Sequence, residues 1–307
     1  MKRFHLTFVL HLMFFSMTNL VAAGDKPHAV VVVGTHHYAP QVTMPKFAAE
    51  LGRLGMRTTV INPEWDPEKD DRGLPGLEAL ETADVAIFFV RFLSIGEEQL
   101  QHIRKFVEAG KPVVCFRTST HAFKYAEGHE HHGLNASFGR EVFGTPYLIH
   151  LQGATAVNLV EGAGEHPILT GVADLDGWSS PGTLYLTKLE PGAKGLLQGT
   201  GRPKKPGTRT NQFGTHELKP EMTDTIAWTW ENRWGGRVFG TSLGHAGDFA
   251  DPRSMRVLVN GVFWAAGHAV PSAETPIETF RAGGVKRKRA AGNETGAAKA
   301  ASRSTSD

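Results

Sequence analysis

Cysteine is almost missing from this chain of 307 residues, which contains only Cys115. A single cysteine cannot form an internal disulfide, so packing of an apolar core has to stabilise the fold. The chain also lacks an excess of one charge, because 33 Lys and Arg residues are balanced by 31 Asp and Glu residues, for a formal net charge of +2. This balance argues against a nucleic-acid footprint over the folded part.

Long apolar runs are scarce as well, and the one at the N-terminus is short and interrupted by polar residues. Lys2 and Arg3 precede the run at residues 4–20, which ends in Val21-Ala22-Ala23. This order of charged, apolar and small residues is typical of a secretory signal peptide. We therefore expect cleavage after Ala23, export to the periplasm or the extracellular space, and no membrane span in the mature protein. The alternative is an uncleaved membrane anchor.

The C-terminal segment is poor in apolar residues. From Pro271 onward the composition shifts to Ala, Gly, Ser, Thr and charge, and residues 286–289 form its dense basic run. Such a segment has too little apolar area to offset the entropy of ordering it. We therefore predict one domain over residues 24–270 and a disordered basic tail over residues 271–307. Contact of the basic run with nucleic acid or an anionic surface is the alternative to a solvated tail.

Strand and helix patterns alternate through most of the domain. Residues 29–33 are a continuous apolar, β-branched run, which is typical of a strand buried on both faces of a parallel sheet. Apolar residues then recur at helical spacing before Gly55. The last helix begins with Asp251 as cap and Pro252 in its first turn. Further strands are expected at residues 58–61, 85–90, 112–116 and 238–243. The alternation predicts an α/β fold, a doubly wound and mostly parallel sheet with helices on both faces.

The pattern weakens between Gly144 and Gly240. Glycine and proline punctuate this region, and it contains only short candidate strands, at residues 155–160, 183–186 and 225–230. Residues 199–206 are predicted to form an exposed loop.

Polar residues follow the predicted parallel strands where those strands end. Ligands of open α/β sheets bind outside the carboxyl ends of the strands, so these turns are the candidate site. They carry His36, His37 and Tyr38 after the first strand, Arg91 after the third and His121 after the fourth. We expect His36, His37 and Tyr38 to bind substrate.

Four residues are predicted to be catalytic. Histidine suits proton transfer near neutral pH, so His121 and His245 are the candidate acids and bases. Asp248 is placed to orient His245, or alternatively is a turn residue before the last helix. Arg117 is predicted to anchor negative charge, with an ion pair to a neighbouring carboxylate as the alternative.

Other candidates are a hydroxyl, a thiol and an indole. Ser119 follows a strand and is expected to offer an exposed hydroxyl to substrate, although the Gly-x-Ser-x-Gly elbow of hydrolases is absent. Cys115 lies inside the strand, which predicts a buried and unreactive thiol. Trp234, next to two glycines, is predicted to be exposed and to stack on a sugar.

Metal binding is an open alternative. Residues 128–133 hold three histidines and a glutamate between two glycines, and such clusters can bind one zinc or a similar ion. The spacing matches no closed zinc framework, and a solvated loop is the other interpretation. No cofactor is required by the sequence.

Several segments together resemble one known family. They are Gly110–Val114 leading to Arg117–Phe123, Trp228–Asn232 leading to Gly240–His245, Asp248-Phe249, and Asn260–Ala265. They make the chain similar to ThuA-like (trehalose utilisation) proteins, within the class I glutamine amidotransferase-like fold. The resemblance implies a flavodoxin-like sheet and a small-molecule sugar as ligand, a disaccharide or ketosugar. Amidotransferases of this fold carry a nucleophilic cysteine after the strand that here ends near Phe116, where this chain has Arg117, Thr118 and Ser119.

Three hypotheses follow. In the first, the protein belongs to carbohydrate catabolism and His121 and His245 exchange protons with a sugar. In the second, it binds a sugar without catalysis, on an amidotransferase-like scaffold that has lost the thiol. In the third, it is a metal-dependent hydrolase that uses His36, His37, His121 or the loop at residues 128–133.

Overall fold

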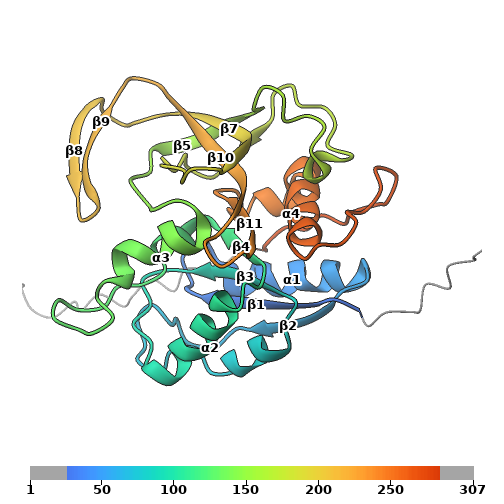
Figure 1. Ribbon diagram of the computed structural model, residues 1–307. Helices are drawn as coiled ribbons and strands as arrows, with labels where there is room; N and C mark the ends of the chain where they lie inside the picture. Colours follow the sequence, from blue (N-terminus) through green and yellow to red (C-terminus); the bar gives the residue numbers. More distant parts are fainter. Residues whose placement is uncertain (1–25, 284–307) are drawn as a thin grey trace, which may run out of the picture.

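The computed structural model of the protein describes residues 26–283 (Figure 1). The predicted signal peptide and the basic run at residues 286–289 lie outside this range, so export and the role of that run remain predictions. The helices are α1 (Pro40–Arg53), α2 (Glu97–Glu108), α3 (Leu134–Phe143) and α4 (Pro252–Ala265), with short 3-10 helices η1 (Leu77–Thr82), η2 (Arg117–His121), η3 (Pro167–Leu169) and η4 (Asp248–Ala250). The strands are β1 (His28–Gly34), β2 (Arg57–Ile61), β3 (Val85–Val90), β4 (Val113–Phe116), β5 (Gln152–Leu159), β6 (Ser179–Ser180), β7 (Lys194–Arg202), β8 (Gly207–Asn211), β9 (Gly214–Leu218), β10 (Met222–Glu231) and β11 (Arg237–Thr241).

One nine-stranded sheet organises the chain, in the order β2-β1-β3-β4-β11-β10-β7-β5-β6. The pairs from β2 through β11 are parallel, and those from β11 through β6 are antiparallel. The predicted α/β class and doubly wound sheet are confirmed. The parallel part has the flavodoxin-type order, in which the chain reverses its direction of winding between β1 and β3. That reversal opens a crevice at the carboxyl ends of these two strands.

Two apolar layers enclose the parallel strands. All of β1 is buried because alternate residues pack on opposite faces. Val31 and Val33 belong to the layer that includes residues of α1 and α4, whereas Val30 and Val32 belong to the layer that includes residues of α2 and α3. Cys115 is fully buried in β4, as predicted, and burial raises the pKa of its thiol well above the usual value. The strand ends are therefore held by packing from both sides.

The last helix begins where the sequence predicts. The Asp251 carboxylate accepts hydrogen bonds from the backbone N–H groups of Arg253 and Ser254, at 2.9 and 3.1 Å, and Pro252 occupies the first turn. This cap satisfies two of the N–H groups that a helix start leaves without an internal partner.

The predicted loop at residues 199–206 is wrong in its first half. Gly199 and Gly201 lie inside β7 and pair with β10. A side chain at Gly199 would meet Ile226 and Thr155 at 2.7 and 2.5 Å, so glycine marks a close approach of neighbouring side chains and not a turn. β8 and β9 form a separate two-stranded sheet, which projects to one side of the antiparallel strands (Figure 1).

The predicted boundary at residue 270 also needs correction. The backbone N–H of Phe280 donates to Phe249 O at 2.9 Å, and the two rings stack with centroids 5.2 Å apart. Glu50 of α1 accepts from the N–H of Glu278 at 2.8 Å, and Arg256 of α4 donates to Ser272 O at 2.9 Å. The composition of this segment does not predict its order, because the segment is fixed by one stacked aromatic ring and by hydrogen bonds to buried charged side chains of α1 and α4. The rest of the predicted tail lies outside the described residues.

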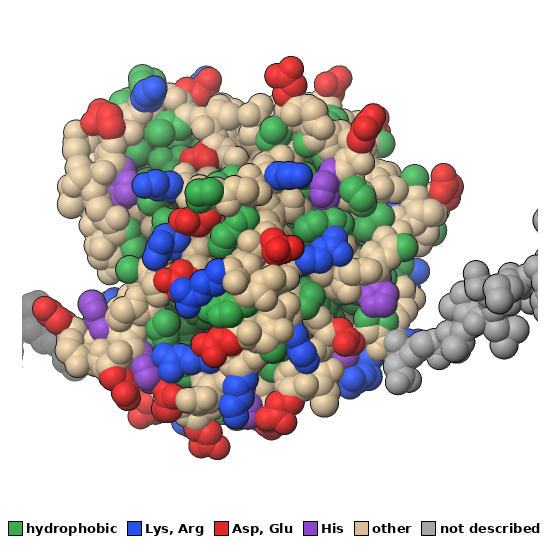
Figure 2. Space-filling model, in the orientation of Figure 1, with side chains coloured by type: hydrophobic (Ala, Val, Ile, Leu, Met, Phe, Trp, Pro, Cys, Tyr) green, Lys and Arg blue, Asp and Glu red, His purple; other side chains and the backbone are tan. Residues whose placement is uncertain are grey.

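Two surface properties bear on partners. Within residues 26–283 no helix is long and apolar enough to cross a membrane. On the face seen in Figure 2, Lys and Arg side chains are interspersed with Asp and Glu. The absence of a nucleic-acid partner stays a prediction.

Candidate functional site

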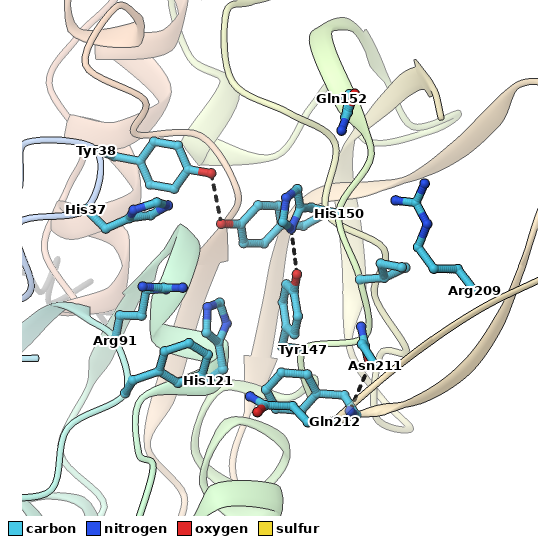
Figure 3. A pocket seen from close by; sticks show the side chains of 14 residues that line it. His37, Tyr38, Arg91, His121, Tyr147, His150, Gln152, Arg209, Asn211 and Gln212 are labelled. Atoms are coloured by element: carbon cyan, nitrogen blue, oxygen red, sulfur yellow. Dashed lines mark hydrogen bonds between the residues drawn. The ribbon is translucent and has the colours of Figure 1, made fainter. Parts of the chain in front are cut away.

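A cavity of about 390 Å³ opens at the carboxyl ends of β1, β3 and β4 (Figure 3). This is the crevice that the strand order creates, and its volume suits a small-molecule ligand. The antiparallel half of the molecule supplies the opposite wall. The lining consists of His37, Tyr38, Arg91, Phe92, His121, Tyr147, Ile149, His150, Gln152, Tyr185, Arg209, Asn211, Gln212 and Phe213.

The backbone is strained where each of these three strands ends. Tyr38 after β1, Phe92 after β3 and Arg117 after β4 have φ angles of 72°, 49° and 41°. The left-handed region is unfavourable for bulky side chains, so such residues persist only where the surroundings hold them, and they cluster at functional sites. The apolar layers on both faces of the sheet fix the backbone of these three residues in that conformation.

Three histidines line the cavity in their uncharged form. Burial and the charge of Arg91 lower the pKa of His121 well below its usual value and also lower the pKa of His37. Burial and Arg117 lower the pKa of His150. A neutral imidazole can accept a proton, so all three are able to act as bases near neutral pH.

Tyr147 joins two of these imidazoles. Its hydroxyl lies 2.6 Å from Nδ1 of His150, and its ring centroid is 4.1 Å from that of His121 (Figure 3). Burial raises the pKa of Tyr147 to about 12, so its hydroxyl keeps its proton. This contact fixes the orientation of His150 within the wall.

Arg117 is a buried charge behind the lining, with 1 % of its surface exposed. Its guanidinium donates to the backbone oxygen of Ser242 and packs against the rings of Tyr38 and Tyr185, with Cζ 4.3 and 4.9 Å from their centroids. Its Nε and Nη2 have no hydrogen-bond partner among the described residues, and no carboxylate of that part lies within 4.0 Å. The predicted alternative of an ion pair is therefore wrong.

The buried charge of Arg117 acts on the hydroxyl of Tyr38. The Tyr185 hydroxyl donates to the Tyr38 hydroxyl at 3.4 Å (Figure 3). Burial alone would raise the pKa of Tyr38, but the charge of Arg117 and the hydrogen bond from Tyr185 outweigh it, and the pKa lies below its usual value. The site therefore stabilises negative charge at the Tyr38 oxygen.

Arg91 is oriented by an ion pair. Its guanidinium pairs with Glu68, whose other oxygen accepts from the hydroxyl of Thr35 at 2.8 Å. Arg91 also lies over the ring of Phe92, with Cζ 4.3 Å from the centroid. The cation is thus placed at the cavity wall by a carboxylate that is not part of the lining.

The predicted pair of His245 and Asp248 lies beside the cavity. The His245 ring packs edge-on against Tyr38, with centroids 5.8 Å apart, and burial lowers its pKa. The buried Asp248 carboxylate accepts from the hydroxyl of Ser180 at 2.7 Å and from the backbone N–H groups of Gly244 and His245 at 2.8 Å each. It therefore holds the backbone of the turn, which is the alternative role predicted for it, while Nδ1 of His245 accepts from the backbone N–H of Gly247 at 3.2 Å.

Three predicted substrate contacts also lie outside the lining of the cavity. The hydroxyl of Ser119 is fully buried; it donates to Phe88 O at 2.8 Å and accepts from Val90 N at 3.1 Å, which ties η2 to the end of β3. Trp234 lies on the turn that precedes β11, at the amino ends of the parallel strands. It is half-buried against the layer of α2 and α3, at the opposite edge of the sheet from the cavity. His36 is half-buried outside the lining, and its N–H donates to Asp66 at 3.0 Å.

The histidine-rich loop at residues 128–133 has other partners. His129 stacks on Tyr125, with centroids 4.7 Å apart, and Nε2 of His131 lies 2.7 Å from Oε2 of Glu97. Across residues 26–283 no group of three or more His, Cys, Asp or Glu side chains is arranged to hold a metal ion. The metal-binding alternative for this loop therefore has no such group of side chains in the described part of the chain.

Nine of the fourteen lining residues come from the weakly patterned region between Gly144 and Gly240. Tyr147, His150, Tyr185, Arg209 and Phe213 lie there. No periodicity distinguishes them, because they lie in short segments between turns, and their aromatic, imidazole and guanidinium groups are the only signal. The hairpin of β8 and β9 is held over the cavity where Asn211 Nδ2 donates to Leu148 O at 2.9 Å.

Comparison with known proteins gives one consistent family. The model of the ThuA family, described as trehalose utilisation, matches residues 29–265. A search of curated proteins finds no significant match. A ThuA-like protein from Bacteroides uniformis has a similar structure, with a TM-score of 0.53 and 15% identity over 80% of this chain and 93% of that one. Another from Parabacteroides merdae has a TM-score of 0.50 and 13% identity over 84% and 98%. These likenesses agree with the predicted flavodoxin-like, amidotransferase-like sheet.

Proposed function

We propose that this chain, which belongs to the ThuA (trehalose utilisation) family and so has a sugar-related role, is an enzyme that moves protons on a disaccharide or ketosugar. The observation that carries the proposal is the convergence of His37, His121 and His150, all with lowered pKa values, on one cavity. Perturbed groups that meet in a pocket are typical of acid–base catalysis. Its export, predicted from the N-terminus, would place this activity in the periplasm or outside the cell.

His121 is the proposed base. It would remove a proton from the carbon next to the sugar carbonyl, and the electron pair of that C–H bond would move to the carbonyl oxygen to give an enediolate. Return of the proton to the same or the neighbouring carbon completes an epimerisation or isomerisation without a co-reactant. His150, oriented by Tyr147, is placed to carry the second proton.

Arg117 and Tyr38 are the proposed stabilisers of the enediolate. A buried guanidinium with two unpaired N–H-bearing nitrogens sets up positive potential before the reaction, so little reorganisation is needed as charge develops. Tyr38, whose hydroxyl lies next to this charge, would donate a hydrogen bond to the enediolate oxygen. His245 supports Tyr38 from outside the lining, and Asp248 supports His245 through the turn.

Solvent exchange tests the proposal without knowledge of the product. Trehalose, other disaccharides and their keto forms are incubated with the protein in D₂O, and loss of the C–H signal next to the carbonyl is followed by NMR. We expect exchange with a keto form, reduced by at least about 100-fold in His121→Ala. The matched control is His268→Ala, because His268 is exposed and lies on the turn after α4.

The result that contradicts the proposal is full exchange in His121→Ala. Unequal melting temperatures of the two variants would show that folding and not chemistry had been changed, in which case His121→Gln, which keeps a polar side chain of similar length, replaces His121→Ala.

A second candidate is a sugar-binding protein without catalysis. The aromatic lining favours it, since Phe92 and Phe213 lie nearly parallel, at 7°, with centroids 6.5 Å apart, and Tyr147 meets Phe213 edge-on. Such faces stack on sugar rings. Saturable binding of a disaccharide with no exchange and no product after long incubation would favour this function over the first.

A further inference from the structure

A second cavity of about 630 Å³ adjoins the first. The two share three residues, Tyr147, Gln212 and Phe213, which form the boundary between them. The second lining also contains the lysines Lys124 and Lys188 and the aromatic residues Phe123 and Tyr125. A ligand that fills both cavities therefore has at least two units, with an aromatic pair where the units join.

The charges of the two linings have one sign. Arg91 and Arg209 lie in the first, Lys124 and Lys188 lie in the second, and neither lining contains an Asp or Glu among the described residues. Arg91 is paired with Glu68 behind the wall. The other three cations form no ion pair within 4.0 Å in the described part of the chain.

This lining is unusual for a neutral sugar. A sugar hydroxyl both donates and accepts, and a carboxylate is the side chain that only accepts. Without carboxylates the two cavities offer an excess of charged donors, and the buried Arg117, with its two unpaired nitrogens, adds positive potential at the inner end. A group that only accepts hydrogen bonds and carries negative charge satisfies such donors best.

We propose that the two cavities together bind an acidic saccharide of at least two units, one unit in each cavity, with carboxylate groups next to Arg209 and Lys188. The inference rests on the proposed function for its premise that the ligand is a sugar. It adds the substrate class, a uronic- or aldonic-acid-containing disaccharide or oligosaccharide, and it assigns a second subsite.

Calorimetric titration of residues 24–307 with four probes tests this class. The probes are digalacturonate, galacturonate, cellobiose and glucose 6-phosphate. We expect digalacturonate to bind at least about tenfold more tightly than galacturonate or cellobiose, because charge-assisted hydrogen bonds contribute at that level, and its affinity to fall as ionic strength rises. Equal affinity for cellobiose and digalacturonate would overturn the proposal, and so would glucose 6-phosphate binding more tightly than digalacturonate.

Two pairs of variants separate the subsites. Arg209→Gln should weaken both acidic probes about tenfold, whereas Arg202→Gln, which removes an exposed arginine of β7 outside the linings, should leave them unchanged. Lys188→Gln should weaken digalacturonate and not galacturonate, and Lys204→Gln is its exposed control. Arg91 is left intact because its loss would leave the largely buried Glu68 unpaired, whereas the ion-pair partner of Arg202, Glu221, is exposed. Equal effects of Arg209→Gln and Arg202→Gln would show only long-range attraction and would overturn the site.

The failure of this inference and the failure of the proposed function give different results. Exchange into a neutral ketosugar that depends on His121, together with no preference for acidic probes, overturns the acidic class and leaves the enzyme. Tight, Arg209-dependent binding of digalacturonate with no exchange into any sugar supports the acidic class and overturns proton transfer.

Discussion

The two walls of the cavity differ in how they are held. The wall formed by the ends of β1, β3 and β4 rests on strands covered on both faces, and three of its residues have strained backbones. The opposite wall is formed by residues 147–152, Tyr185 and the hairpin of β8 and β9. Several of its residues are half-exposed, and Asn211 hydrogen-bonds the hairpin to Leu148.

The difference suggests that the first wall stabilises the transition state and that the second wall selects the ligand. A strained backbone and a buried charge such as Arg117 persist only where the surrounding residues are rigidly packed. The groups that stabilise a transition state therefore belong on the first wall, which has such packing. Groups that select a ligand tolerate some motion, and Arg209, Asn211 and Phe213 belong on the second. We therefore expect substitutions on the two walls to differ in their effects on stability and on ligand binding.

The first experiment compares a phenylalanine of the apolar layer that supports the first wall with a phenylalanine of the second wall. Phe47 is fully buried in α1 and packs edge-on against Phe116 and Phe249, with centroids 5.7 and 5.9 Å away. We expect Phe47→Ala to lower the free energy of unfolding by about 3–5 kcal/mol, because it removes apolar burial and leaves a cavity. Phe213→Ala on the hairpin should lower it by less than about 1 kcal/mol and should weaken sugar binding. Denaturant unfolding measures both, and similar losses would erase the contrast.

Acidification is expected to give the next largest effect. Burial lowers the pKa of His121 in the folded protein, so between that pKa and the ordinary value of about 6.5 the unfolded chain binds the extra proton. The stability that neutral His121 contributes is therefore fully present above about pH 6.5 and is lost as the pH falls from there towards the folded pKa.

Unfolding at pH 7.5 and at pH 5 measures this effect. The loss between the two should be smaller in His121→Ala than in the wild-type protein, whereas His268→Ala should behave as the wild type does. An equal loss in all three proteins would show that His121 does not carry a depressed pKa.

Ser119 is the test of a corrected prediction on the first wall. Ser119→Ala leaves the oxygen of Phe88 and the N–H of Val90 without this partner, so we expect a loss of about 1–3 kcal/mol in the free energy of unfolding. Sugar affinity should not change. Thr118→Ala is a suitable control, since its hydroxyl is equally buried and has no partner among the described residues. Weaker sugar binding without loss of stability would return Ser119 to the substrate site.

The first wall is also the one that sequence patterns could predict. Buried parallel strands are continuous apolar runs, such as residues 29–33 and 85–90. Their ends identify the lining residues His37, Tyr38, Arg91 and His121, and also Arg117, which is buried behind the lining. The periodicity places these residues at one edge but does not orient their side chains. That is why the pattern predicts a substrate contact for Ser119 and a catalytic role for Asp248, although both side chains satisfy backbone groups.

The second wall had no comparable signal. β5, β7 and β10 alternate buried and exposed residues only in part. Gly199 and Gly201 lie within β7 because neighbouring side chains leave no room there for a larger residue. His150 is held at the cavity by its antiparallel bridge to Tyr185, and the hairpin that carries Arg209 is held there by the hydrogen bond from Asn211 to Leu148. Both contacts join residues far apart in the chain, which local pattern does not specify. For Trp234, the flanking glycines predict exposure but do not indicate which edge of the sheet the residue occupies. It lies on the turn before β11, at the amino ends of the parallel strands and away from the cavity.

The smallest effect on stability is expected at the tether of the hairpin. Asn211→Ala removes the hydrogen bond to Leu148 O and the one that Oδ1 accepts from Phe213 N at 2.7 Å, and we expect about 1 kcal/mol or less in the free energy of unfolding. Hydrogen exchange at the amides of β8 and β9 should nevertheless become faster, while exchange in β1 and β3 stays unchanged. Thr215→Ala, which alters the same hairpin away from the cavity, is the control. Faster exchange in β1 as well would mean that the two walls open together and that the second wall is not a separate, adaptable element.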